Sequence, residues 1–179
     1  MRSSPPPGQF DVTLPAINED TIDHNCFGCG NQNLNGLRLR FRPLDGDGVW
    51  AAFTPSASHE GYLGLTHGGI ISTVLDEAMS WAVTHTGDLG VTARMALTFR
   101  RPLRLGQETR VLAWVTGRRA RTIDTRAELR DQATNDVLAA AEGRFVRVTR
   151  EQAAAWREAY GTQIDETAFG AAARRNAEG

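Results

Sequence analysis

The sequence contains no lysine, and its 20 basic residues are all arginine. They nearly balance the 21 Asp and Glu residues, which leaves a formal net charge of −1. A chain without an excess of either charge has no overall field that would attract nucleic acid or an anionic membrane, so we expect neither as a partner. The arginines either offer guanidinium forks for local phosphate binding or reflect genomic composition, and their even spread favours the second.

Long apolar runs are also missing. No stretch approaches the roughly 18 apolar residues of a membrane-spanning helix, and the first ten residues, MRSSPPPGQF, have no apolar core of signal-peptide length. Cysteine is scarce, since Cys26 and Cys29 are the two in the chain and lie too close together to staple a fold. A reduced cytoplasmic protein is expected. Although His24 lies near the pair, a closed zinc site needs four ligands, so no metal is expected.

The length of 179 residues fits one domain. Residues 1–20 contain a proline triplet and no periodic pattern, which predicts a flexible arm or one draped over the surface. The single domain is expected to span residues 21–160. Residues 161–179 are rich in alanine and charge, and we expect them to form a frayed tail.

Apolar and polar residues alternate with the period of two that a half-buried strand requires. The pattern predicts a hairpin of strands at 37–42 and 49–53, joined by Asp45-Gly46-Asp47-Gly48. Four more strands are expected at 91–99, 107–117, 122–130 and 137–149. The first of these four is expected to carry one apolar face, made of Val91, Ala93, Met95, Leu97 and Phe99.

A helical period interrupts the strands at residues 67–84, and a short helix is expected at 151–160. The first helix carries an apolar stripe of Ile71, Val74, Leu75, Ala78 and Ala82. The order of strand, strand, helix and four strands describes an α+β domain in which an antiparallel sheet of about six strands wraps one central helix. That arrangement is the hotdog fold.

The start of the central helix, Thr66-His67-Gly68-Gly69, has the character of an anion site. Two adjacent glycines leave the first backbone N–H groups open to a ligand, and such groups stabilise the oxyanion that forms when a thioester carbonyl is attacked. The alternative is that Gly68 and Gly69 only allow close packing between helix and sheet.

Asp76 lies nine positions after His67, on the same helix face as Gly69, Ser72, Thr73 and Ser80. It is either a catalytic carboxylate or an ordinary surface residue, and of Asp76 and Glu77 one is expected to be merely solvated. Nine residues correspond to roughly 13 Å along a helix. If both ends are catalytic, the carboxylate of one subunit must therefore meet the glycines of another, which requires a two-fold dimer.

These residues resemble a known family. His67-Gly68-Gly69, Asp76, Thr92 and the run Phe99-Arg100-Arg101-Pro102-Leu103 are similar to the acyl-CoA thioesterases of the hotdog superfamily, in the branch of phenylacetate-pathway enzymes and thioesterase-superfamily members. The preceding Cys26-Phe-Gly-Cys-Gly30, with Asn33, Gly36 and Leu37, resembles the N-terminal part of that branch. The likeness spans residues 24–149.

The resemblance implies hydrolysis of an acyl-CoA thioester by Asp76 as base or nucleophile, with the oxyanion held by the backbone of Gly68 or Gly69. His67 would orient the thioester, and Thr92 would hold the attacking water or serve only as a strand residue. Some relatives carry an amide side chain shortly before the histidine, whereas this chain has His59-Glu60-Gly61-Tyr62.

Coenzyme A carries phosphates, and Arg100 and Arg101 are the expected anchors unless they are simply solvated. Coenzyme A is part of the substrate, so no cofactor is expected. The enzyme would be a homodimer or homotetramer with its active site at the subunit interface. Two other functions stay open: a non-catalytic acyl-CoA binding protein, and a hotdog dehydratase acting on hydroxyacyl thioesters.

Overall fold

The structure is a computed structural model that describes residues 10–19 and 24–160. The predicted tail at 161–179 and the first nine residues of the predicted arm lie outside the described residues. Along the chain the elements are β1 (Arg42–Leu44), β2 (Gly48–Phe53), the 3-10 helix η1 (Ala57–His59), α1 (Gly68–His85), β3 (Gly90–Phe99), β4 (Thr109–Arg118), β5 (Thr122–Asp131), β6 (Val137–Arg147) and α2 (Arg150–Tyr160).

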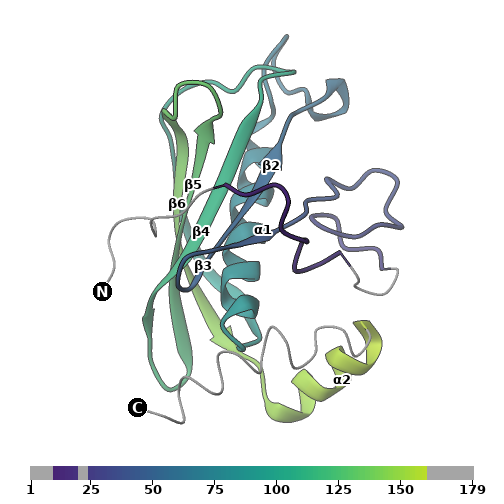
Figure 1. Cartoon of the computed structure of the whole chain (residues 1–179), viewed down its shortest axis with the longest axis vertical. Coiled ribbons are helices and arrows are strands. Elements are labelled where there is room, and N and C mark those ends of the chain that lie inside the picture. Colours follow the sequence, from purple (N-terminus) through teal and green to yellow (C-terminus); the bar gives the residue numbers. More distant parts are fainter. Residues whose placement is uncertain (1–9, 20–23, 161–179) are drawn as a thin grey trace.

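All six strands form one antiparallel sheet in the order β1-β2-β4-β5-β6-β3. The helix α1 lies along one face of this sheet (Figure 1). The predicted α+β hotdog fold, with one long helix between the second and third strands, is confirmed. At its edges the sheet presents the short β1 and the ten-residue β3.

The sequence forms α1 because its apolar residues recur on one side of a helix. The five residues of the predicted stripe, from Ile71 to Ala82, are all buried. They pack with side chains of the sheet, among them Val111, Leu129 and Phe145, in a single core. This packing against β2, β4, β5, β6 and β3 fixes the rotation of α1, and hence the direction in which each polar residue of the helix points.

The predicted strand at 37–42 is wrong over most of its length, because pairing begins only at Arg42. Arg38 has a φ of 52°, in the left-handed region, which interrupts an extended strand. The N–H groups of Leu37 and Leu39 donate instead to the carbonyls of Phe27 and Gly28, at 2.8 and 2.9 Å. Leu39 is buried as its pattern predicts, but it is tied to the 26–30 loop rather than to the sheet.

The single apolar face predicted for β3 is wrong at its start, because a bulge changes the phase of the strand, whereas Met95 and Leu97 pack against the core as predicted. Thr92 pairs with Phe145 and Arg94 pairs with Arg144, which leaves Ala93 as the extra residue. Thr92 therefore faces α1 together with Met95, whereas strict alternation would have turned it away.

The described part of the predicted arm, residues 10–19, packs against the start of the sheet. Asn18 is 1% exposed; its Nδ2 donates to the Leu39 carbonyl and its Oδ1 accepts from the Phe41 N–H, both at 2.9 Å. The ring of Phe10 meets Trp50 edge-on at 5.4 Å. This segment covers the backbone between 39 and 41, which has no strand partner of its own.

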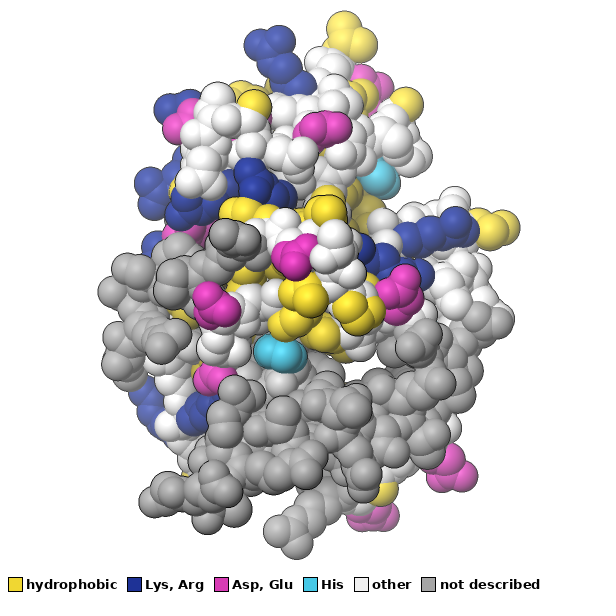
Figure 2. Space-filling view, viewed as in Figure 1, with side chains coloured by type: hydrophobic (Ala, Val, Ile, Leu, Met, Phe, Trp, Pro, Cys, Tyr) yellow, Lys and Arg dark blue, Asp and Glu magenta, His cyan; other side chains and the backbone are white. Residues whose placement is uncertain are grey.

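Arg side chains and acidic side chains are interspersed on the face shown in Figure 2, in keeping with the near-zero net charge. A helix long and apolar enough to cross a membrane is not found among the described residues.

Candidate active site

The candidate site begins at the N-terminus of α1, where His67 is the N-cap residue. Its Nδ1 accepts a hydrogen bond from the Gly69 N–H at 2.9 Å. When Nδ1 of a neutral imidazole is an acceptor, the proton lies on Nε2. His67 therefore caps the helix with one nitrogen and, in its neutral form, offers an N–H donor with the other.

The two glycines predicted to hold an oxyanion differ in their hydrogen bonding. The Gly69 amide is already bound to His67, whereas the Gly68 amide has no partner among the described residues. A Cβ on residue 68 would lie 3.3 Å from Cζ of Phe99, so Gly68 also serves close packing. Gly68 rather than Gly69 thus provides a free amide at the helix N-terminus.

A groove of about 580 Å³ runs past this amide. It is lined by Gly61, Tyr62, Leu65, Thr66, His67, Gly68, Ile71, Phe99, Arg100, Arg101, Pro102 and Leu103. The structure thus brings His67, Gly68 and both predicted arginine anchors to one surface. Thr66 was predicted as part of the segment that opens the helix but without a role of its own. Its buried hydroxyl has no hydrogen-bond partner within the described ranges.

The two arginines of the groove are in different electrostatic states. Arg101 donates to the Asp136 carboxylate at 2.5 Å, and its side chain is 61% exposed. Arg100 forms no ion pair with any residue that the structure describes. Both backbone N–H groups donate to the Leu138 carbonyl, which fixes this turn after β3. Arg100 is therefore the available cation in the groove.

Asp76 lies on α1 outside this groove, and it is partly buried. The Thr92 Oγ1 donates a hydrogen bond to Asp76 Oδ1 at 2.8 Å, so the β3 bulge and the helix together hold the carboxylate. Thr92 and Asp76 are thus brought together. Gly68 and Asp76 are not, because they are eight positions apart on the helix, a distance of roughly 12 Å along its axis.

Glu77 is not merely solvated, and neither is Asp76, so that expectation is wrong. The Glu77 Oε1 accepts a hydrogen bond from Trp81 Nε1 at 3.0 Å, and its two oxygens lie 3.8 and 3.7 Å from Cys26 Sγ. Burial, followed by the nearby Cys26, raises the pKa of Glu77 to about 7. The contact with Trp81 could have been predicted from the sequence, because residues four positions apart are neighbours on a helix.

The two cysteines share this environment. A hydrogen bond from Cys29 is the main factor that lowers the pKa of Cys26 to about 5. The same contact, together with burial, raises the pKa of Cys29. The 26–30 loop is therefore attached to α1 one residue after Asp76.

Comparison with known proteins relates the part of the chain that contains this site to a known superfamily. A profile of the thioesterase superfamily matches residues 63–138. A solved thioesterase superfamily protein is 24% identical over 68% of this chain, with a TM-score of 0.65, and the match spans only 60% of that protein. The PaaI protein from the phenylacetic acid degradation operon of E. coli is 21% identical over 63% of this chain and 81% of its own, with a TM-score of 0.59.

A third solved structure, from Streptococcus mutans, is described as bound to acetyl CoA. It is 17% identical over 62% of this chain and 88% of its own, with a TM-score of 0.58. Identities this low establish a shared fold. No curated protein sequence matches the chain at a significant level.

Proposed function

We propose that this chain, whose hotdog fold and resemblance to the thioesterase superfamily are confirmed, hydrolyses an acyl-CoA thioester to the free acid and coenzyme A. The observation that carries this proposal is the layout of α1. The helix offers the unpartnered Gly68 amide to a groove and, two turns later, a carboxylate fixed by Thr92. An amide donor and a carboxylate are what hydrolysis of a thioester needs.

In the proposed reaction, the thioester carbonyl oxygen lies against the Gly68 N–H, which stabilises the negative charge of the tetrahedral intermediate. The Nε2–H of His67 donates to the same oxygen and takes the orienting role that an amide side chain fills in some relatives. Asp76 either removes a proton from the attacking water or attacks the carbonyl carbon itself, giving an anhydride that water then opens. In both cases the C–S bond breaks and coenzyme A leaves as its thiol.

The distance between Gly68 and Asp76 requires a second copy of the chain. The side of α1 that carries Asp76 lies beside β3, an edge strand with most of its residues exposed, including Val91 at 48% and Phe99 at 53%. We propose that a partner subunit covers this surface, so that its Asp76 faces the first subunit's Gly68. Both homodimers and homotetramers satisfy this requirement.

Coenzyme A as the leaving group is supported by Arg100, the unpaired cation in the groove, and by the acetyl CoA in the relative from Streptococcus mutans. The hydrolysis as proposed uses no cofactor. A reduced cytoplasmic location suits the two free cysteines and is part of the same proposal.

The function is tested by incubating the protein with a panel of acyl-CoAs and measuring released thiol. The chain itself carries two thiols. The protein is therefore used in trace amounts, so that thiol released by turnover far exceeds the protein's own. Continuous thiol release supports the proposal. Binding of an acyl-CoA without thiol release would indicate a binding protein, and water loss from a hydroxyacyl-CoA without thiol release would indicate a dehydratase. Either result contradicts it.

Thr92→Val should lower kcat by about 10-fold, because it keeps the side-chain shape but removes a hydrogen bond to a charged carboxylate. The KM should change little. Thr98→Val on the same strand is the matched control, since the Thr98 side chain is exposed and points to the opposite face of the sheet from Thr92. Equal kcat values for the two variants would exclude Thr92 from positioning Asp76.

Arg100→Gln should raise the KM for acyl-CoA about 3- to 10-fold while leaving kcat nearly unchanged, because one charge-assisted contact to phosphate is lost. The increase should shrink at high ionic strength, which screens the wild-type contact. Arg121→Gln, in the exposed turn between β4 and β5, is the control. A KM that rises equally in both variants would assign the effect to overall charge.

A further inference from the structure

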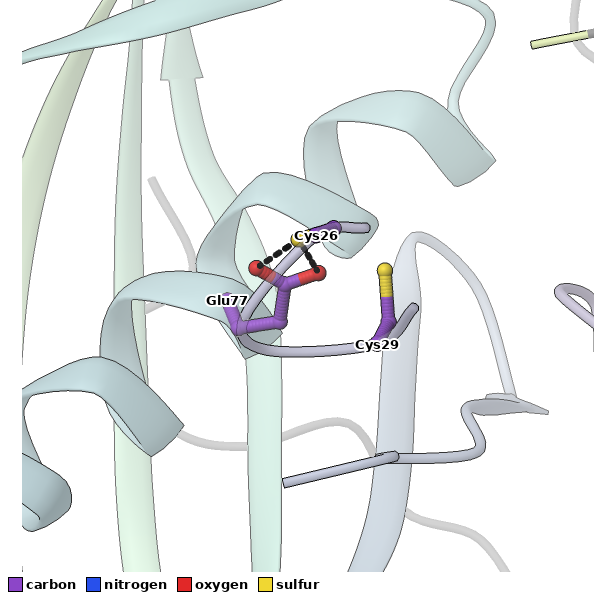
Figure 3. A group of neighbouring side chains, drawn as sticks. All are labelled: Cys26, Cys29 and Glu77. Carbon is purple, nitrogen blue, oxygen red and sulfur yellow. Dashed lines mark hydrogen bonds between the residues drawn. The ribbon is translucent and has the colours of Figure 1, made fainter. Parts of the chain in front are cut away.

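The 26–30 loop and α1 bring together three side chains that ordinarily bind metals: Cys26, Cys29 and Glu77 (Figure 3). Their ligand atoms all lie within 4.8 Å of one another. Cys29 is 5% exposed, whereas Cys26 and Glu77 are partly buried. The group is thus closed on the Cys29 side and reachable from the Cys26 side.

The spacing between Cys26 and Glu77 fits a shared ion. In tetrahedral zinc sites the metal lies about 2.3 Å from sulfur and about 2.0–2.2 Å from a carboxylate oxygen, so the two ligand atoms are about 3.6 Å apart. Cys26 Sγ lies 3.8 and 3.7 Å from the two oxygens of Glu77. Little movement is needed for both side chains to bind the same ion.

The backbone is shaped to admit the carboxylate. A Cβ on residue 28 would come within 2.4 Å of the Glu77 carboxylate carbon, so only glycine leaves room for it between the two cysteines. Trp81 Nε1 donates a hydrogen bond to Glu77 Oε1 and so orients the carboxylate, as supporting hydrogen bonds do in metal sites. None of the three ligands forms a salt bridge within residues 10–19 and 24–160.

We propose that Cys26, Cys29 and Glu77 bind a divalent ion of the zinc class, with both cysteines as thiolates. Two sulfur ligands favour zinc over calcium or magnesium. Binding displaces the protons that these three side chains still hold, which pass to solvent, and leaves the fourth position of a tetrahedral ion to water. The ion would bind the N-terminal loop to α1 next to Asp76. The proposal is independent of the proposed hydrolysis.

No metal was predicted from the sequence because only residues near the cysteine pair in the chain were considered as ligands. Glu77 lies 51 positions after Cys26, so no short sequence motif includes it as a third ligand.

The test uses the full chain, loaded with one equivalent of zinc, desalted and analysed for metal. About one zinc per chain should be retained, and cobalt in its place should give the near-ultraviolet absorption of a thiolate–cobalt bond. Because loss of a residue that only supports a ligand typically lowers metal affinity about 10- to 100-fold, loss of a direct ligand in Cys26→Ser, Cys29→Ser or Glu77→Gln should lower it at least as much. Glu142→Gln, whose side chain is 75% exposed, should bind like wild type.

Wild-type measurements keep the test decisive if the cysteine variants fail to fold. Zinc should raise the melting temperature and protect both cysteines from a thiol reagent, and a chelator should reverse both effects. The proposal is overturned if both thiols react at the same rate with and without zinc and cobalt gives no thiolate band. It is equally overturned if the cysteines oxidise in air to a disulfide that zinc does not slow, which would identify a redox pair.

Discussion

Asp76→Asn should lower kcat about 10²- to 10⁴-fold, the range associated with losing a positioned general base. The amide has nearly the same size as the carboxylate, and its oxygen still accepts the hydrogen bond from Thr92, so the local structure is retained. It lacks both the basicity to activate water and the charge to act as a nucleophile. The measurement is steady-state thiol release, with circular dichroism to confirm the fold.

Two controls define this result. Asp45→Asn lies in the exposed hairpin turn between β1 and β2 and should leave kcat unchanged. Glu77→Gln tests the neighbouring carboxylate, which faces the cysteines and not Thr92. Near-normal turnover in Asp76→Asn would end the proposed mechanism, whichever acyl-CoA is used.

Mixing two inactive variants should restore activity, because each proposed site combines Gly68 of one subunit with Asp76 of the other. Gly68→Val places a side chain against Phe99 and across the free amide, so it should reduce kcat at least about 100-fold. In a dimer of Gly68→Val with Asp76→Asn, one of the two sites contains both native residues. An equal mixture that exchanges freely should recover about a quarter of wild-type activity.

The recovery must depend on subunit exchange. Each variant carries a different affinity tag, and activity should rise in step with the fraction of doubly tagged dimer. Each variant mixed with itself should stay inactive. If doubly tagged dimers form and no activity returns, the site does not combine these two residues across subunits.

Much of the fold was predictable because its elements are amphipathic over many residues. The stripe from Ile71 to Ala82 predicted α1, and four alternating segments predicted β3 to β6 with boundaries close to those observed. Two local departures were not predictable. Neither the left-handed Arg38 nor the bulge at Ala93 changes the apolar pattern, because both depend on where the partner backbone lies.

The candidate site divides in the same way. His67 and Gly68 are adjacent in sequence, so their common place at the start of α1 was predictable, whereas the groove they share with Arg100 was not, because Arg100 comes from the turn after β3. The choice of Gly68 over Gly69 was not predictable either, because it depends on which amide the His67 ring takes as its partner. The surroundings of Glu77 were missed, since they come from a loop about 50 residues earlier in the chain.

The bulge in β3 makes Ala93 an extra residue of the strand. Thr92 pairs with Phe145 and Met95 pairs with Gly143, so both side chains face α1 although they are three positions apart. Deleting Ala93 would restore regular pairing with β6 and leave Thr92 two positions before Met95, still on the side that faces Asp76. Loss of one residue at this point should therefore be tolerated, even though the same change in a regular strand turns every following side chain to the other face.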